Sequence, residues 1–412
     1  MPRLAAPFCV RSFRFQWSAD LLTSWAFEME TVILGWYVLI ATGSVVFLTI
    51  FAALQYVGTL LAPFIGVAGD RVGHRNLLIA ARALYAAVAA ALMLLAFCAA
   101  LTPILVCALA ALSGLARPSD LGLRGALIAE TVPHELLTGA AGISRTTTDS
   151  ARVAGALVGA GLFATVGIGA AYVVVTSFYA LGALLILRVE HGPRADRVAA
   201  TERAGRASAW SDLREGIVHI WDSPRLLAVV WIAFLFNLAA FPMTQGLLPY
   251  VAREIYRVDE TGLGYLVASF AFGALLGSLA LSRFGMVEHL ARSMIGAAVV
   301  WFTLLLVFAQ MRDLYGGIAS LLLTGFAQSI AMVSHTVILL REAAPRIRGR
   351  VMGVRMLAIY SLPLGILAAG VLIGRIGFRA TASLYAAVGL AMVLLTAWHW
   401  RGVLLHRRAD RA

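Results

Sequence analysis

Several charged residues stand inside otherwise apolar stretches of this sequence. Glu28 and Glu30 lie near the middle of the first such stretch, and Arg145, Asp149 and Arg152 lie together in the fifth. An ionised group in a hydrocarbon environment costs on the order of 2.5–3.5 kcal/mol, so such residues usually mark an ion or substrate pathway. These five positions are therefore the first candidates for chemistry.

Glu28 lies on a polar stripe with spacings of three and four residues, as expected for one face of a helix. The stripe consists of Asp20, Ser24, Glu28, Thr31 and Gly35. Glu30 is two residues further on and therefore points about 200° away on a helix, so the two carboxyl groups cannot face the same cavity centre. A low-dielectric cavity favours the protonated carboxyl group, which suits a proton carrier. Pairing with an arginine of a neighbouring helix and a different helix boundary are the two alternatives.

Arg145, Asp149 and Arg152 have helical spacing, because Asp149 follows one arginine by four residues and precedes the other by three. Side chains at these spacings can pair within one helix. One acid between two arginines leaves a positive charge over, available to Glu28, to Glu30 or to an anionic substrate. A purely structural role for the triplet is equally compatible with the sequence.

The other candidates are more isolated. Asp120, near the end of its helix, could accept hydrogen bonds from arginines of the preceding loop, or it could be solvated. The second half offers four possible cavity residues, which are Asn237, Gln245, Gln328 and Arg355. No His, Cys, Asp and Glu set has metal-ligand spacing and no nucleophile–base pair is present, so we expect no metal, no cofactor and no enzymatic activity.

The composition indicates an integral membrane protein. Of 412 residues, 61% are apolar and 13% charged, with a mean hydropathy of +0.87, whereas soluble domains are near half apolar and a quarter charged. All 33 basic residues are Arg, which excludes a Walker A lysine and Schiff-base chemistry. The net charge of +12 fits the cytoplasmic face of a membrane protein better than nucleic-acid binding.

Counting uncharged stretches predicts twelve membrane spans. The first half contains three stretches that are each too long for one crossing of about 20 residues. They are Thr31–Gly69, Ala83–Ala116 and Val153–Leu187, with breaks at 41–44, 101–103 and 167–169. The second half contains six shorter uncharged runs, one per span. We therefore expect an all-α membrane protein with twelve helices in two pseudo-symmetric six-helix bundles.

A polar segment, Val189–Pro224, divides the chain into an N-terminal bundle (1–188), a linker (189–224) and a C-terminal bundle (225–412). Within the linker, four apolar side chains share one helical face, which predicts a helix at the membrane surface, with an ordinary loop helix as the alternative. They are Trp210, Leu213, Ile217 and Trp221. If both termini are in the cytoplasm, 26 of the 33 arginines lie at cytoplasmic loops or helix ends. Because positive charge is enriched on the cytoplasmic side of membrane proteins, we expect this orientation.

Weak internal similarity supports a duplicated six-helix unit. At a shift of 212 residues, Arg71-x-Gly73 aligns with Arg283-x-Gly285, and Glu130-x-x-Pro133 aligns with Glu342-x-x-Pro345. Both pairs fall in expected cytoplasmic loops.

The segment from Gly66 to Arg75, GVAGDRVGHR, resembles the GxxxDRxGR[RK] signature loop of the major facilitator superfamily. The resemblance covers most of the chain, and ETVILGWYVLIATGS, LREGIVHIWDSPRLL and RIRGRVMG are similar to the enterobactin-exporter-like branch. There are departures, since His74 stands where an Arg is usual. Gly155-Ala156-Leu-Val-Gly159-Ala160 stands where antiporters tend to have GPxxGG.

The resemblance implies a gate at the signature loop. Gly66 and Gly73 would allow a tight turn, and Asp70 would face the start of a helix near Gly353 in the other bundle. Arg71 and Arg75 would hold the loop to Asp120 or to lipid headgroups, and His74 would make any ion pair there pH-sensitive.

We therefore expect a monomeric bacterial inner-membrane transporter that exports a small hydrophobic or amphipathic solute, siderophore-like or drug-like, by proton antiport. Its partners would be the solute, protons and the lipid bilayer, with no nucleic acid. The alternatives are uptake or facilitated diffusion of a solute or lysolipid and, in another class, a receptor or sensor that transports nothing.

Overall fold

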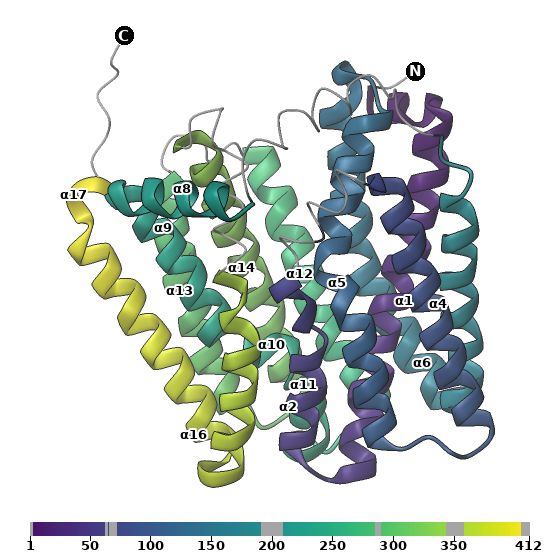
Figure 1. Ribbon diagram of the computed structural model, residues 1–412. Coiled ribbons are helices and arrows are strands. Elements are labelled where there is room, and N and C mark those ends of the chain that lie inside the picture. The colour runs from purple at the N-terminus through teal and green to yellow at the C-terminus, as the bar shows by residue number, and fades with distance from the viewer. Residues whose placement is uncertain are drawn as a thin grey trace. The chain divides into compact units, whose positions relative to one another are not determined.

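The computed structural model describes residues 3–61, 65, 72–190, 209–284, 290–342 and 358–404 of the chain. In this part of the chain all regular secondary structure is helical, so the all-α prediction is confirmed (Figure 1). The helices form two compact units, an N-terminal unit of Met1–Ala209 with Arg257–Ala268 and a C-terminal unit of Trp210–Tyr256 with Ser269–Ala412. Bundle boundaries at 188 and 225 stay a prediction.

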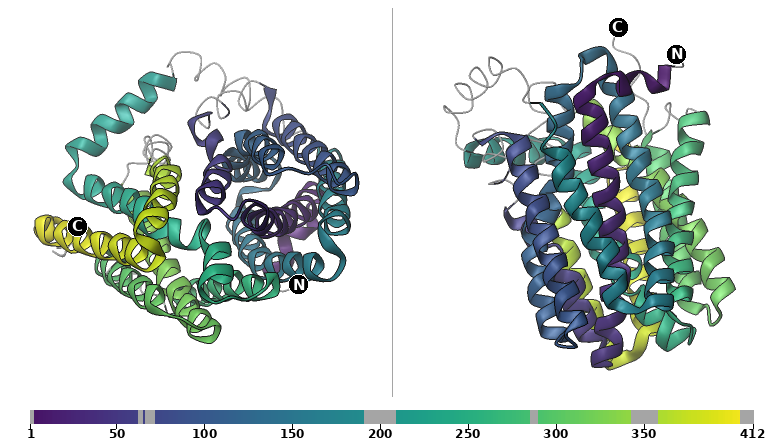
Figure 2. Two further views of the ribbon diagram at one scale, coloured as in Figure 1. Left: turned by 90° about the horizontal axis from the view of Figure 1, so that it is seen from below. Right: turned by 90° about the vertical axis from the view of Figure 1, so that its right-hand side faces the viewer.

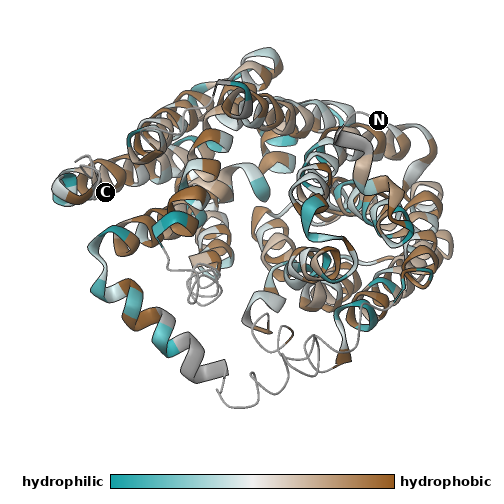
Figure 3. Cartoon of the chain, turned by 90° about the horizontal axis from the view of Figure 1, so that it is seen from above, coloured by the Kyte–Doolittle hydropathy of each residue, from teal (hydrophilic) through white to brown (hydrophobic). Residues whose placement is uncertain are grey.

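The N-terminal unit consists mainly of long helices that lie side by side, as the end-on view shows (Figure 2). Its elements are η1 (Arg3–Cys9), α1 (Arg11–Thr42), α2 (Val45–Leu54), η2 (Val57–Leu61), α4 (His74–Phe97), α5 (Pro103–Thr131), η3 (His134–Leu136) and α6 (Leu137–Ile186). Apolar residues occur along all of these helices, interrupted by hydrophilic ones (Figure 3).

The helix breaks lie where the sequence predicts them. Gly43 ends α1 in the left-handed conformation at φ 62°, which glycine adopts without steric cost. Thr102 caps α5 with Pro103 at its first position, where a missing N–H is harmless. Gly167 interrupts α6 at φ 77° and ψ 175°, so this 50-residue element contains two successive helices.

In the second half of the chain, the segment that follows α8 is a helix that is broken repeatedly. The elements of this half are α8 (Ala209–Asp222), α9 (Pro224–Leu235), η4 (Phe236–Ala240), α10 (Phe241–Gln245), α11 (Leu248–Tyr250), η5 (Val251–Ile255), α12 (Glu260–Phe284), α13 (Leu290–Gln310), α14 (Leu314–Glu342), α16 (Ser361–His399) and α17 (Arg401–Leu404). The residues of α12 up to Ala268 belong to the N-terminal unit. Both η4 and η5 are π-helical turns. Because Pro242 and Pro249 lack the N–H that would continue the ladder, the interruptions fall around them.

Backbone conformations repeat between the two halves of the chain. Gly377 breaks α16 at φ 80° and ψ 165°, close to the angles of Gly167. This equivalence supports the duplication that the sequence predicts.

Eight helices are long and apolar enough to cross a membrane among the described residues. Two of them, α6 and α16, are each divided by a glycine with positive φ. The chain is thus a multi-pass membrane protein, and the count of twelve spans stays a prediction.

The predicted surface helix forms as α8, which runs across the direction of α9 (Figure 1). Ile217 and Trp221 are exposed, whereas Ile220 is buried. The side chains of Trp210 and Leu213 lie outside the described ones. Membrane contact by this helix stays a prediction.

Glycines bring two pairs of helices into backbone contact. A Cβ atom on Gly114 of α5 would overlap the carbonyl oxygen of Leu54, and one on Gly58 would overlap that of Leu115. In the C-terminal unit, Gly273 of α12 and Gly325 of α14 make the same kind of contact, with the carbonyl oxygens of Leu322 and Phe270. Such close approaches between small residues stabilise helix association in membranes.

We expect Gly114→Ala to lower the melting temperature of the purified protein by several degrees, because overpacking costs about 1–3 kcal/mol. Gly122→Ala in the same helix is the matched control, since no atom lies within 4 Å of its added methyl group. Both variants would be heated in detergent and analysed by size-exclusion chromatography. Equal melting temperatures would contradict the contact.

Candidate functional site

The buried centre of the N-terminal unit is an ion pair between Glu30 of α1 and Arg117 of α5. Arg117 Nη2 donates to Glu30 Oε2 at 2.8 Å, and the hydroxyl of Tyr179 of α6 donates to the same oxygen at 2.9 Å. Arg117 also donates to the side chain of Gln55, and its guanidinium carbon lies 4.3 Å from the ring centroid of Phe27. The pair thus connects four segments of the unit.

Aromatic rings separate this ion pair from bulk water. Phe27 lies 5.0 Å from Tyr85 and 5.6 Å from Tyr179, measured between ring centroids, and the two tyrosines are 5.7 Å apart. Both tyrosines are almost fully buried. In such surroundings an unpaired charge is costly, so Glu30 and Arg117 depend on one another.

Glu28 belongs to a second, accessible ion pair. Its Oε1 lies 3.5 Å from Nε of Arg152 in α6, and the two side chains are 26% and 37% exposed. Glu30, by contrast, is only 8% exposed. The two carboxyl groups of α1 therefore face different surroundings, as their spacing predicts.

Close packing of α1 against α6 allows the Glu28–Arg152 contact. A Cβ atom on Gly155 would lie 2.8 Å from Cβ of Glu28, and one on Gly159 would lie 2.7 Å from Cα of Met29. A larger residue at either position would push the two helices apart.

The predicted pairing within α6 is present on one side only. Arg145 Nε donates to Asp149 Oδ2 at 3.0 Å, whereas Arg152 contacts Glu28 of α1. Of the roles that the sequence left open for Arg152, the geometry therefore shows pairing with a carboxylate of another helix.

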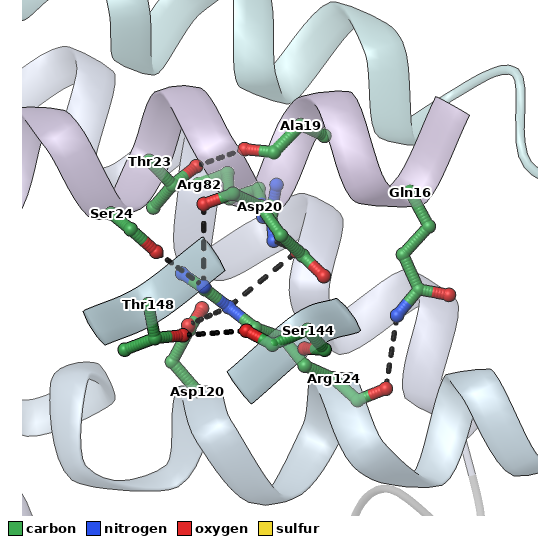
Figure 4. A network of polar contacts seen from close by, with 10 residues as sticks. All are labelled: Gln16, Ala19, Asp20, Thr23, Ser24, Arg82, Asp120, Arg124, Ser144 and Thr148. Atoms are coloured by element: carbon green, nitrogen blue, oxygen red, sulfur yellow. Dashed lines mark hydrogen bonds and ion pairs between the residues drawn. The ribbon is translucent and has the colours of Figure 1, made fainter. Parts of the chain in front are cut away.

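A third cluster lies further towards the N-terminus of α1 (Figure 4). Arg82 of α4 pairs with Asp20, and Arg124 of α5 pairs with Asp120 and lies 3.5 Å from Asp20. Arg124 also donates to Ser24 Oγ at 2.8 Å. All four ionised side chains are buried, and the two carboxylates balance the two guanidinium groups.

The sequence analysis missed two buried arginines, Arg82 of the third cluster and Arg117 of the pair with Glu30. Both border the uncharged stretch 83–116 and were interpreted as helix ends, but α4 begins at His74 and α5 continues to Thr131. The sequence analysis expected Asp120 to pair with arginines of the preceding loop, whereas its partner among the described residues is Arg124. The polar stripe that includes Asp20 was the available signal.

At the signature loop the structure describes Gly73, His74 and Arg75. Gly73 precedes α4 at φ 96°, His74 Nδ1 lies 2.7 Å from Glu130 Oε1, and Arg75 donates to the carbonyl of Leu187. The remaining predicted gate residues, Gly66, Asp70, Arg71 and Gly353, lie outside the described residues, as does Arg355. The gate stays a prediction.

The C-terminal unit has a different polar character. Asn237 lies in the π-helical turn η4 and donates to the carbonyl of Ala233 at 2.9 Å, Gln245 ends α10 and Gln328 is buried in α14. Where its residues are described, the Asp, Glu and Arg side chains of its long helices lie in terminal turns or beside the break at Gly377. Ion pairs in the middle of described helices thus belong to the N-terminal unit.

No three His, Cys, Asp or Glu side chains among the described residues lie close enough together to hold a metal ion. The arrangement instead offers carboxylates that can exchange protons and guanidinium groups that can bind anions. Apolar crossing helices that contain such pairs define a polytopic membrane protein with paired charges along its helices.

The chain belongs to the Major Facilitator Superfamily, whose family model matches residues 18–360. It is therefore a membrane transporter and not an enzyme.

Macrolide efflux protein A of Streptococcus pyogenes is 22% identical over 269 residues, which are 65% of this chain and 64% of that protein. The chain thus matches less than two thirds of this relative's length. Among solved structures, the nucleoside transporter NupG has a TM-score of 0.73 at 14% identity, and the match covers 95% of this chain and 99% of that one. The peptide transporter PepTSo has a TM-score of 0.76 at 12% identity, with 97% and 99% covered. At these identities the structures share the fold.

We expect Glu30→Gln to lower the melting temperature strongly, because it leaves Arg117 buried without its carboxylate at a cost of about 3–5 kcal/mol. The double variant Glu30→Gln with Arg117→Met removes both charges and should recover most of the loss. The measurement is a thermal melt of each purified protein in detergent. A double variant that loses the sum of both single effects would show that the two side chains do not act as a pair.

Proposed function

We propose that this transporter is a monomeric proton antiporter in a bacterial inner membrane that exports a small hydrophobic or amphipathic solute, siderophore-like or drug-like. Both termini would lie in the cytoplasm. The observation that carries the proposal is the accessible ion pair between Glu28 and Arg152 in the middle of two helices. The macrolide efflux relative supports export.

Glu28 is close to the midpoint of α1. An ion pair at this depth cannot face lipid without paying on the order of 2.5–3.5 kcal/mol for each charge, so its exposed part faces water or solute. A carboxylate that water reaches can gain and lose a proton. Protonation cancels the attraction between Glu28 and Arg152 and so changes the balance of contacts between α1 and α6.

We assign different roles to the two glutamates of α1. Glu30 is buried and hydrogen-bonded by Arg117 and Tyr179, whereas Glu28 is partly exposed and pairs with Arg152. In this arrangement Glu28 exchanges the proton and Glu30 positions the charge beside it.

We expect Glu28→Gln to reduce proton flux coupled to solute transport at least tenfold, because the amide cannot release a proton. Its yield and melting temperature should match the parent protein, since Glu28 is partly exposed. The assay uses proteoliposomes with an internal pH-sensitive dye, challenged with a macrolide and with a catecholate siderophore. Glu190→Gln is the control. Glu190 is an exposed acid outside the long helices, and its contact with Arg11 is 3.9 Å long.

Full proton-driven transport in the double variant Glu28→Gln with Glu30→Gln would end the proposal. If solute transport by the parent protein does not depend on the proton gradient, facilitated diffusion is favoured instead. Proton and solute moving in the same direction would favour uptake by symport.

A further inference from the structure

Arg145 and Arg152 of α6 contact their acid partners through one edge of the guanidinium group only. Arg145 uses Nε to reach Asp149, at 3.0 Å, and the closest approach of Arg152 to Glu28 is also through Nε, at 3.5 Å. The closest contacts of both arginines are thus made through Nε and not through the terminal amino groups. The two terminal amino groups of a guanidinium group can bind an oxyanion in a bidentate manner.

The accessible charge on this face of α6 is positive. The side chain of Arg145 is 63% exposed whereas that of Asp149 is 7% exposed, and Arg152 is more exposed than Glu28. The other mid-helix arginines of the unit differ, because Arg82 and Arg124 are buried among carboxylates. Among the described arginines of this unit that lie away from helix ends, the more exposed ones are thus on α6.

Both arginines lie on one face of the helix. Seven residues correspond to nearly two turns and to about 10.5 Å along the axis at 1.5 Å per residue. Thr148 lies between them on the same face, with its hydroxyl bonded to the carbonyl of Ser144. Arg152 is near the middle of the helix that ends at the Gly167 break, where free donors cannot face hydrocarbon without cost.

We propose that Arg152 binds the anionic group of the transported solute, which makes the substrate an amphipathic oxyanion such as a carboxylate, and that Arg145, two turns earlier, adds positive potential beside it. This inference rests on the proposed transport function and adds the charge of the substrate. The terminal amino groups of Arg152 hold the oxyanion, while Glu28 and Asp149 fix the orientation of the two guanidinium groups. The apolar part of the solute lies along the neighbouring apolar residues of the helices.

The test measures electrostatic potential and access at Thr148. Thr148→Cys is made in a variant without Cys9, Cys98 and Cys107 and placed in phosphatidylcholine nanodiscs. Its rates of reaction with an anionic sulfonatoethyl and a cationic trimethylammonioethyl methanethiosulfonate are compared. We expect the anionic reagent to be favoured at least fivefold relative to Thr165→Cys, an exposed position near the other end of the same helix.

Arg152→Gln should remove most of this preference, because Arg152 follows Thr148 by one turn and helical side chains point towards the N-terminus of their helix. If Thr148→Cys does not fold, Ser144→Cys, one turn earlier, replaces it. No reaction with either reagent, or a preference for the cation, would overturn the proposal.

Ligand protection then identifies the anion. Octanoate should slow labelling at least threefold, whereas octanamide and octylammonium, which have the same chain length, should not. Protection by octanoate that persists in Arg152→Gln overturns the proposal, and so does protection by phosphatidylglycerol alone, which would assign the site to a lipid headgroup. Labelling requires no proton movement, so its failure is distinguishable from a failure of the Glu28→Gln transport assay.

Discussion

The cost of an unpaired charge in a low-dielectric environment organises the N-terminal unit. Helix α1 supplies three carboxylates, and each meets arginine from a different direction. Asp20 meets Arg82 and Arg124, Glu28 meets Arg152, and Glu30 meets Arg117. Because breaking a buried pair leaves a charge without compensation, the contacts of Asp20 and Glu30 fix the rotation of α1 relative to α4 and α5.

Close helix packing and charge pairing depend on one another in this unit. Gly155 and Gly159 let α6 approach α1, and only at that distance can Arg152 reach Glu28. Gly182 has the same role at the other end of the contact, since a Cβ atom there would lie 2.9 Å from Oγ1 of Thr23. Small residues thus allow the helices to approach closely, and ion pairs form between the helices at that distance.

The two halves of the chain have similar backbone features at corresponding glycines but different polar residues. Gly167 and Gly377 break their helices with nearly the same angles, and Gly114 and Gly325 both touch a neighbouring backbone. Yet at the separation of Gly114 and Gly325, which is 211 residues, the positions that correspond to Arg117, Asp120 and Arg124 are Gln328, Ala331 and His335. Among the described residues, mid-helix charge pairs thus occur in the first half, whereas the second half has uncharged polar groups and a helix interrupted by π-helical turns.

The sequence by itself determined the features that depend on neighbours along the chain. Apolar runs fixed the helical class, the segments 41–44, 101–103 and 167–169 fixed the turns, and helical spacing placed Glu28 and Glu30 on different faces and Asp149 beside Arg145. Only the tertiary structure decided the partners between helices, because they are far apart in sequence. Arg82 is 62 residues from Asp20, and Tyr179 is 149 residues from Glu30. An arginine that interrupts an apolar run looks the same in sequence whether it ends a helix or is neutralised inside a bundle, and the position of a carboxylate on another helix decides between the two.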